Sequence, residues 1–367
     1  MADLGAPTLT ITIKKAADTV VYRLKEGVVA MIVRDATAKA GLYILGDPAD
    51  IPSDLGADVA AGVERAFLGG ENRPQKVLLS VIGAEDDLVK VGAATLAASD
   101  FDYLACPEDV DEEEMEAVVT WLDGVRRKYC IGKLVLPDHA ADNMAVVNFS
   151  ASGIKVGAKS YTGAQYCSRI AGLLAGTPLS DSATSAPLGE VTAVDEVADP
   201  DAAVAAGKLI LIHDGRKVKL CRAVNSLTTV PKDQSEALKK IKIVEAVDLI
   251  RREAKIVIDD QYVGKGNSYD NKMVLVAAFQ DFLSTLEKEG VLQTGSGYAE
   301  LNLEKQRAWL KEQGVDVTGM TDAEILRVDT GSYLWLKLGG TVLDGMEDFD
   351  LEFYMGGSTT VTGGSEA

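Results

Sequence analysis

Hydrophobic and polar positions alternate near both ends of the chain, in the pattern of a β-strand with one apolar and one polar face. Residues 8–13 read "TLTITI" and residues 349–353 read "FDLEF". No Asn-Gly or Asp-Gly hairpin turn follows the first stretch, and a lone strand is not stable in water. Each strand therefore needs a partner, either the edge of its own sheet or another chain. The candidate strand residues are Thr8, Leu9, Thr10, Ile11, Thr12, Ile13, Phe349, Asp350, Leu351, Glu352 and Phe353.

Between these ends the first half of the chain alternates continuous apolar runs with helical patterns. The runs, typical of strands buried on both faces, are 28–33, 76–82, 103–107, 133–137 and 208–215. The patterns with helical spacing are 54–69, 111–129 and 162–176. This alternation predicts an α/β fold, in which helices cover a sheet.

The pattern changes near residue 180. Residues 177–201 are rich in Ser, Thr, Pro and Asp, which predicts an exposed connection. The stretch 239–262 begins like a strand and continues as a helix, and a long helix is expected from the cap Ser268 to Gly290. The remaining expected elements are a polar helix over 302–313, a capping box at Thr321 and Glu324, and strands over 332–340 and 346–355.

The charge balance narrows the classes of partner. The chain has 37 Lys and Arg against 56 Asp and Glu, a net charge of −19. Such a balance disfavours binding to a nucleic-acid backbone or to an anionic membrane surface. No apolar run is long enough to span a bilayer and no amino-terminal signal pattern is present, so we expect a soluble protein made in a cytoplasm. The charge serves solubility, or keeps free subunits apart.

Candidate chemistry is sparse. The cysteines Cys106, Cys130, Cys167 and Cys221 form no C-x-x-C pair and are expected to be buried free thiols. His139 and His213 are isolated, which suits hydrogen-bonding turn residues better than a catalytic dyad or a metal site. Residues 264–268, "GKGNS", lack the spacing of a phosphate-binding loop and predict a turn. We therefore assign no catalytic, cofactor-binding or metal-binding residue.

Several segments together resemble one family. They are "RAVNSLTTV" at 222–230, "KKIKIVEAVDLI" at 239–250, "YVGKGNSYDNK" at 262–272, "CSRIAGLLAGTPLS" at 167–180, "GSYLWLK" at 331–337 and "VLDGMEDFDLEF" at 342–353. In order and spacing they resemble the tail sheath proteins of contractile-tailed phages and phage-tail-like bacteriocins, in particular the short sheaths from Gram-positive hosts. The resemblance covers most of the chain, more thinly from about 40 to 150.

The resemblance implies a structural protein of the virion tail, assembled in the bacterial host cytoplasm. Sheath subunits stack in helical rings around a tail tube, and contraction drives the tube through the target envelope. The implied partners are other copies of the chain, the tube, and baseplate and tail terminator proteins. No cofactor is implied, and no serine-protease motif supports catalysis.

The resemblance also implies a division of the chain. We expect an amino-terminal arm with an exchanged strand over 1–25 and an outer α/β sheath domain over 26–220. An inner α+β assembly domain over 221–345 and a carboxyl-terminal strand arm with a flexible tail over 346–367 follow. In this arrangement both end strands pair in neighbouring subunits and complete a small sheet in the inner domain.

Contact with the tube is assigned to the helix 302–313. Its charged residues leave only a narrow apolar stripe, and such a helix often bridges between bodies, although it can equally be a plain surface helix. The candidate tube-facing residues are Glu304, Lys305, Arg307 and Lys311. Two alternatives stay open for the whole chain: a soluble α/β enzyme or small-ligand-binding protein, and another strand-exchanging assembly protein such as an inner tube. The inner tube is disfavoured because tube subunits are smaller and mostly β.

Overall fold

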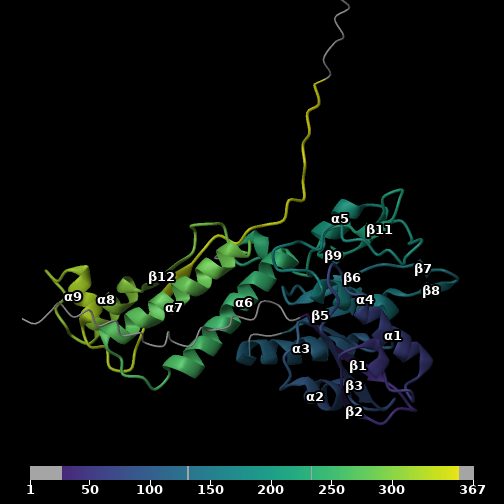
Figure 1. The fold of residues 1–367 in the computed structure, drawn as a ribbon, viewed down its shortest axis with the longest axis horizontal. Helices are drawn as coiled ribbons and strands as arrows, with labels where there is room; N and C mark the ends of the chain where they lie inside the picture. The colour runs from purple at the N-terminus through teal and green to yellow at the C-terminus, as the bar shows by residue number, and fades with distance from the viewer. Residues whose placement is uncertain (1–26, 130–131, 233, 355–367) are drawn as a thin grey trace, which may run out of the picture.

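The computed structural model describes residues 27–129, 132–232 and 234–354. Its first body is built on a seven-stranded sheet (Figure 1). The strands, in spatial order, are β2 (Gly41–Leu45), β3 (Lys76–Ile82), β1 (Val28–Arg34), β4 (Tyr103–Ala105), β5 (Lys133–Pro137), β6 (Val146–Phe149) and β9 (Lys208–Leu209). All neighbours are parallel except β2, which runs antiparallel to β3 at one edge.

Helices cover both faces of this sheet, which explains the continuous apolar runs. In β1, Val29 and Met31 enter one core and Ala30 and Ile32 enter the other. The first core lies under α1 (Ala57–Phe67) and α4 (Gly163–Ala175). The second lies under α2 (Ala94–Leu96), the π-helical turn Leu88–Ala93 before it, and α3 (Glu112–Tyr129). The predicted α/β fold is confirmed.

The connection after α4 differs from the prediction. It was expected to be exposed over 177–201, but Ala183, Leu188 and Val191 are buried in the first core. The polar residues between them form turns around these apolar anchors. The predicted strand 208–215 is also divided into β9 and β10 (Leu211–His213), and β10 pairs with β11 (Val218–Leu220). Two further short strands, β7 (Ile154–Val156) and β8 (Lys159–Tyr161), pair with each other, and α5 (Pro200–Ala205) precedes β9.

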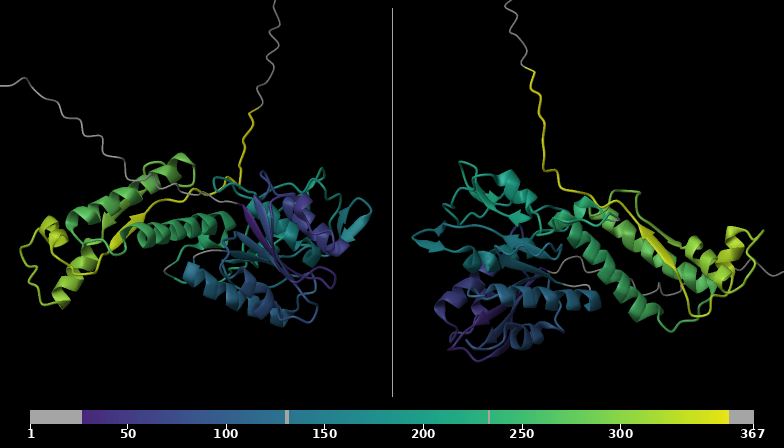
Figure 2. Two further views of the ribbon diagram at one scale, coloured as in Figure 1. Left: turned by 60° about the horizontal axis from the view of Figure 1, so that its bottom comes forward. Right: turned by 180° about the vertical axis from the view of Figure 1, so that it is seen from behind.

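The second body is formed by two long helices and a small sheet (Figure 2). Its elements are α6 (Ile241–Val257), a π-helical turn (Ile258–Tyr262), α7 (Tyr269–Lys288), β12 (Tyr298–Leu301), α8 (Leu303–Glu312), α9 (Asp322–Arg327) and β13 (Leu336–Gly339). The caps predicted at Ser268 and Thr321 are present, and Gly290 has a positive φ of 71° just after α7. The predicted turn over 264–268 likewise precedes α7.

Two strand predictions in this body need correction. Residues 239–262 do not begin as a strand: α6 starts at Ile241, because Ile241, Val244 and Leu249 recur with helical spacing on its buried side. The strand expected over 332–340 is shortened to β13. The described part of the expected strand 346–355, residues 346–354, forms no strand within the chain.

A buried polar cluster fastens α6 to the first body. Asp248 receives two hydrogen bonds from the Arg126 guanidinium, at 2.9 and 2.7 Å, and lies 3.2 Å from Lys133 Nζ. Tyr103 in β4 donates to Glu245 at 2.5 Å. Burial alone would raise the pKa of Asp248, but the Lys133 and Arg126 charges hold it below its ordinary value. The two bodies are thus joined by paired charges rather than by apolar contact alone.

After β13 the chain returns along α7 towards the first body and then leaves the molecule (Figures 1 and 2). Residues 340–354 follow this course, with an isolated bridge between Leu292 and Val342 on the way. The expected amino-terminal strand, residues 8–13, lies outside the described residues, as does the tail from 355 onward.

Candidate assembly interface

The register of the small sheet β12–β13 determines which backbone groups pair within the sheet and which point outward. Its antiparallel register pairs Tyr298 with Gly339 and Leu301 with Leu336. Beyond the strands, the Asn302 amide donates to the Trp335 carbonyl at 2.8 Å. Since hydrogen-bonded pairs alternate along an antiparallel ladder, the backbone groups of Leu336 and Leu338 point away from β12.

The two faces of this sheet differ in polarity. Leu336, Leu338 and Ala299 pack against the apolar core between α6 and α7. On the other face, Lys337 Nζ lies 3.1 Å from the Glu300 carboxylate and 5.6 Å from the centre of the Tyr298 ring. Any side chain at Gly339 would collide with that ring, so this glycine makes room for Tyr298. The sheet therefore has a buried apolar face and an exposed charged face.

The outer edge of β13 is open. Among the described residues, no hydrogen bond joins the outward backbone groups of Leu336 or Leu338 to another part of the chain. Unpaired backbone groups on an edge strand are a template for a further strand. A strand added here would continue both the apolar and the charged face.

The predicted carboxyl-terminal strand residues form an exposed apolar segment. Phe349, Leu351 and Phe353 are 79%, 88% and 84% exposed. Asp350 and Glu352 between them are exposed as well. Burying three such side chains on association would remove several kcal/mol of unfavourable hydration, at about 1.5–3 kcal/mol each. This segment has the composition of a strand, and it pairs with no other strand among the described residues.

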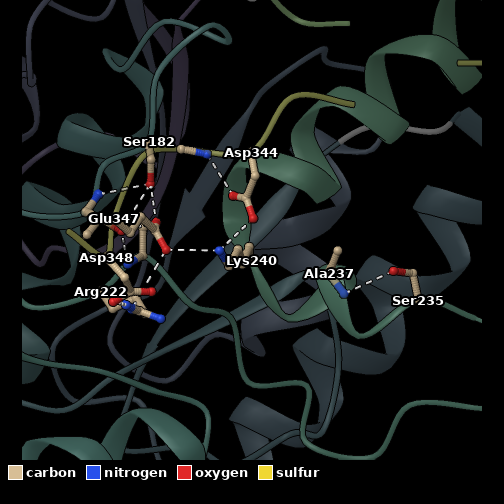
Figure 3. A network of polar contacts seen from close by, with 11 residues as sticks. Ser182, Arg222, Ser235, Ala237, Lys240, Asp344, Glu347 and Asp348 are labelled. Atoms are coloured by element: carbon tan, nitrogen blue, oxygen red, sulfur yellow. Dashed lines mark hydrogen bonds and ion pairs between the residues drawn. The ribbon is translucent and has the colours of Figure 1, made fainter. Parts of the chain in front are cut away.

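The base of this segment is fixed to both bodies (Figure 3). Lys240 Nζ lies 2.6 Å from Asp344 Oδ2 and 3.0 Å from Glu347 Oε2. Glu347 also accepts hydrogen bonds from Ser182 Oγ, at 3.0 Å, and Thr184 Oγ1, at 2.6 Å. Arg222 pairs with Asp348 and lies 3.8 Å from Glu347. We call this set the arm anchor: Ser182, Thr184, Arg222, Lys240, Asp344, Glu347 and Asp348.

The electrostatics of the arm anchor favour the charged forms. The Glu347 side chain is only 4% exposed, and burial alone would raise its pKa. The hydrogen bonds from Thr184, Lys240 and Ser182 hold that pKa below its ordinary value instead. The pKa of Asp344 is likewise lowered by Lys240 against the effect of burial, and that of Lys240 is raised. The arm therefore leaves the molecule from a fixed point.

The predicted tube-facing residues do not form one uniform patch. Glu304, Lys305 and Lys311 are exposed on α8, whereas Arg307 is half-buried and bonds to Asp322 at 2.5 Å. The inner side of α8 is held by Leu310, which is buried, and by Gln306, which donates to the Ile325 carbonyl at 2.7 Å.

Beside α8 lies an aromatic cluster that the sequence analysis missed. The Trp309 ring lies 5.7 Å from that of Tyr333 and 5.6 Å from that of Trp335, centre to centre. The Tyr333 and Trp335 rings are stacked within 6° of parallel. Tyr333 is exposed and the two tryptophans are half-buried. A signal was available, because Tyr333 and Trp335 are two residues apart and so share a face of extended chain.

An enzyme-like cavity of about 170 Å³ lies at the carboxyl ends of β1 and β4, where α/β folds place their ligands. Its arginines are already engaged. Arg34 pairs with Asp109 at 2.9 Å and with Glu114, and Arg65 donates to the Gln165 carbonyl at 2.9 Å. Burial raises the pKa of Cys106 to about 12, so its thiol stays protonated. The cavity is smaller than a usual ligand site.

The remaining candidate chemistry is dispersed. His139 is buried 2.9 Å from Glu112, and exposed His213 accepts from the Gly215 amide at 3.1 Å. Of the cysteines, Cys167 is buried as expected, Cys106 and Cys221 are only partly so, and Cys130 lies outside the described residues. Within the described ranges no group of three or more His, Cys, Asp or Glu side chains could hold a metal ion. No helix in those ranges is long and apolar enough to cross a membrane.

Solved structures share this fold. A sheath tail protein from Desulfitobacterium hafniense matches with a TM-score of 0.64 and 14% identity, covering 80% of this chain and 93% of its own. The helical sheath of the anti-feeding prophage in its contracted state matches with a TM-score of 0.67 and 16% identity, covering 96% and 100%. The contracted sheath complex of the extracellular contractile injection system PVC matches with a TM-score of 0.63 and 10% identity, covering 96% and 99%.

Sequence comparison gives the relationship directly. No family model matches the chain. The tail sheath protein of Clostridium phage phiCD119 is 33% identical over 360 residues, which span 96% of this chain and 99% of the phage protein. With that identity over nearly its whole length, the chain belongs to the family of phage tail sheath proteins.

Proposed function

We propose that this chain is the structural subunit of a contractile tail sheath, polymerises helically around a tail tube, and contracts to drive that tube through a target envelope. The observation that carries this proposal is the presence of a strand donor and a strand acceptor on one chain. The exposed segment 349–353 needs a sheet, and the edge of β13 needs a strand. Sheath proteins among the relatives and structural neighbours support the same role.

In the proposed exchange, Phe349, Leu351 and Phe353 of one subunit extend the apolar face of the small sheet in the next. Asp350 and Glu352 then lie on the face that carries Lys337. This arrangement joins the two apolar faces and brings opposite charges together across the strands. The amino-terminal strand, Thr8 to Ile13, would join the same sheet, so that each inner body links several copies.

The proposed division follows from the same assignment. Residues 26–220 would form the outer domain and 221–345 the inner, tube-side domain, with strand arms over 1–25 and 346–367. The exposed charges of α8, namely Glu304, Lys305 and Lys311, and with them Arg307, would face the tube. Baseplate and tail terminator proteins would contact the two ends of the polymer. Its place would be the virion tail, after assembly in the host cytoplasm.

We propose no enzymatic activity and no cofactor for this chain. The structural role of the relatives supports this view. In the cavity at β1 and β4 the arginines are already bonded to other groups and the Cys106 thiol stays protonated, so neither is ready to act on a substrate. Contraction requires only a second packing of lower free energy and a barrier before it.

Electron microscopy of the concentrated full-length chain tests the proposal. We expect striated tubes or rings, and their loss in the variant Phe349→Ser, Leu351→Ser, Phe353→Ser, because the donated strand then has no apolar face. The matched control Asp350→Asn, Glu352→Gln keeps that face and should still assemble. A second comparison with a chain lacking residues 1–14 tests the amino-terminal arm. Equal assembly by the triple variant and the full-length chain would refute exchange through residues 349–353.

A further inference from the structure

The two edges of the small sheet differ, because side chains of α7 bond to the amino-terminal end of the outer edge of β12. The Ala299 amide donates to Gln280 Oε1 at 3.1 Å, and Gln280 Nε2 donates to the Gly297 carbonyl at 2.9 Å. About two turns further along α7, Glu287 Oε1 accepts from the Gly297 amide at 2.6 Å. The Ala299 amide is one of the groups that a further strand on this side would use, and Gly297 directly precedes β12.

The side-chain amide of Gln280 makes hydrogen bonds that a neighbouring strand would otherwise make. It offers one acceptor and one donor to backbone groups two residues apart, as a neighbouring strand does. Glu287 takes the next amide, and the hydrogen bonds from Gly295 and Gly297 lower the pKa of its carboxyl group. The backbone groups at the amino-terminal end of the β12 edge, at Gly297 and Ala299, are therefore paired without a third strand.

The space beside β12 is also filled. A side chain at position 297 would meet Glu287 Oε1 at 2.9 Å and the Cβ atom of Leu283 at 3.0 Å, so Gly297 is needed for α7 to come this close. Leu301, at the other end of β12, is buried. In contrast, the outward backbone groups of Leu336 and Leu338 on β13 have no hydrogen-bond partner within the described residues.

We propose that Gln280 and Glu287 act as an edge block, which makes the small sheet a one-sided acceptor. This inference rests on the proposed strand exchange and adds its direction: every incoming strand joins at β13, and a second strand can join only beside the first. The block also prevents two free subunits from pairing through their β12 edges, a contact that would compete with ordered assembly.

The test uses the full-length chain, kept dilute so that light scattering reports monomers, and a peptide of residues 346–354, "MEDFDLEFY". Amide hydrogen exchange locates the bound peptide. For the native chain we expect peptide to slow exchange at Leu336 and Leu338 and to leave the Ala299 amide unchanged. For Gln280→Leu we expect peptide to protect the Ala299 amide as well.

Two further variants keep the result decisive. Gln293→Leu, at an exposed position in the turn before β12, is the matched control and should behave as the native chain. Glu287→Ala opens the same edge from the surface and replaces Gln280→Leu if that variant does not fold by circular dichroism. Should peptide protect only the β13 amides in both edge variants, the block is refuted while strand exchange stands. Should the native chain show peptide protection at neither edge, the proposed exchange itself fails.

Discussion

The Lys240 ammonium group lies 3.0 Å from the Glu347 carboxylate and so joins the start of α6 to the base of the carboxyl-terminal arm. The same ammonium group pairs with Asp344, and Ser182 and Thr184 hold the far side of Glu347. A load on residues 349–353 from a neighbouring subunit would therefore be transferred to both bodies near the arm anchor. Beyond Asp348 the described residues of the arm, 349–354, are all exposed.

Removal of the Lys240 charge should release the base of the arm. In Lys240→Met the Glu347 carboxylate stays buried without its cation, and we expect a local cost of about 1–3 kcal/mol. Amide exchange over residues 344–348 should then accelerate by about tenfold or more, since 1.4 kcal/mol is a factor of ten.

Lys239 provides the matched control. It pairs with Glu236 on one turn of surface helix, where an ion pair contributes about 0–1 kcal/mol. Lys239→Met should leave exchange over residues 344–348 unchanged. Equal exchange rates in Lys240→Met and in the native chain would show that the hydroxyl groups and Arg222 suffice to hold the arm.

The arm anchor should also open in acid. The pKa values of Glu347 and Asp344 are lowered in the folded state, so their contribution is complete above the ordinary values of 4.5 and 3.8 and is lost as the pH falls through the lowered values. The pKa of Lys240 is raised, so its contribution is lost only as the pH rises beyond 10.5. The other charged groups in or facing the arm anchor are Arg222, Asp348, Lys242 and Asp181.

Limited proteolysis at residues 344–348 across pH 2–7, with an acid-stable protease, measures this opening. We expect residues 344–348 to be protected near pH 6 and cleaved as the pH falls below about 4. The first body should resist cleavage down to a lower pH than these residues do. In Glu347→Gln the carboxylate that titrates is absent, and the pH dependence should become weaker. A pH dependence identical in Glu347→Gln and in the native chain would assign the effect to other carboxylates.

The buried cluster at Asp248 should govern the coupling of the two bodies. Asp248→Asn leaves the charges of Arg126 and Lys133 buried without their partner, and breaking such a pair costs about 3–5 kcal/mol. We expect urea unfolding to separate into two transitions, followed by Trp121 in the first body and by Trp309 and Trp335 in the second.

A matched control lies on the same helix. Arg252 pairs with Asp100 at 3.2 Å, but the Asp100 side chain is 52% exposed. Asp100→Asn should shift the unfolding midpoint by the equivalent of less than about 1 kcal/mol and keep one transition. A single transition in Asp248→Asn would mean that apolar contacts around α6 couple the bodies without the charge cluster.

Sequence patterns predicted the elements that are buried on both faces or bounded by local signals. The run 28–33 is continuous because β1 faces two cores, and Ser268 and Gly290 mark α7 through local hydrogen bonding and backbone geometry. The start of α6 depended on distant contacts instead. "IKIVE" at 241–245 alternates like a strand over three residues, and packing of its helical stripe decides the outcome.

The arm shows a different limit. Residues 349–353 have the alternation of a strand, yet a strand exists only with a partner, and none is present among the described residues of one chain. The aromatic cluster was equally hidden, because α9 and its flanking turns separate Trp309 on α8 from Tyr333 and Trp335 along the chain. A sequence pattern shows which residues share one segment of the chain. It does not show which residues from other segments the fold places beside them.

The aromatic cluster of Trp309, Tyr333 and Trp335 is a candidate surface for attachment to the tube. Tyr333 and the two tryptophans beside α8 form a partly exposed apolar surface, and such residues often dominate the energy of protein interfaces. If α8 faces the tube, Trp309→Ala should weaken binding to purified tube by at least tenfold in co-sedimentation, as should charge reversal at Lys305 and Lys311. Polymerisation of the chain alone should persist, because Lys305, Trp309 and Lys311 lie on α8 and not on β13. Lys288→Glu, at the exposed carboxyl end of α7, is the control for a change of net charge alone. Unchanged tube binding by all α8 variants would remove this helix from the tube interface and leave the strand exchange untouched.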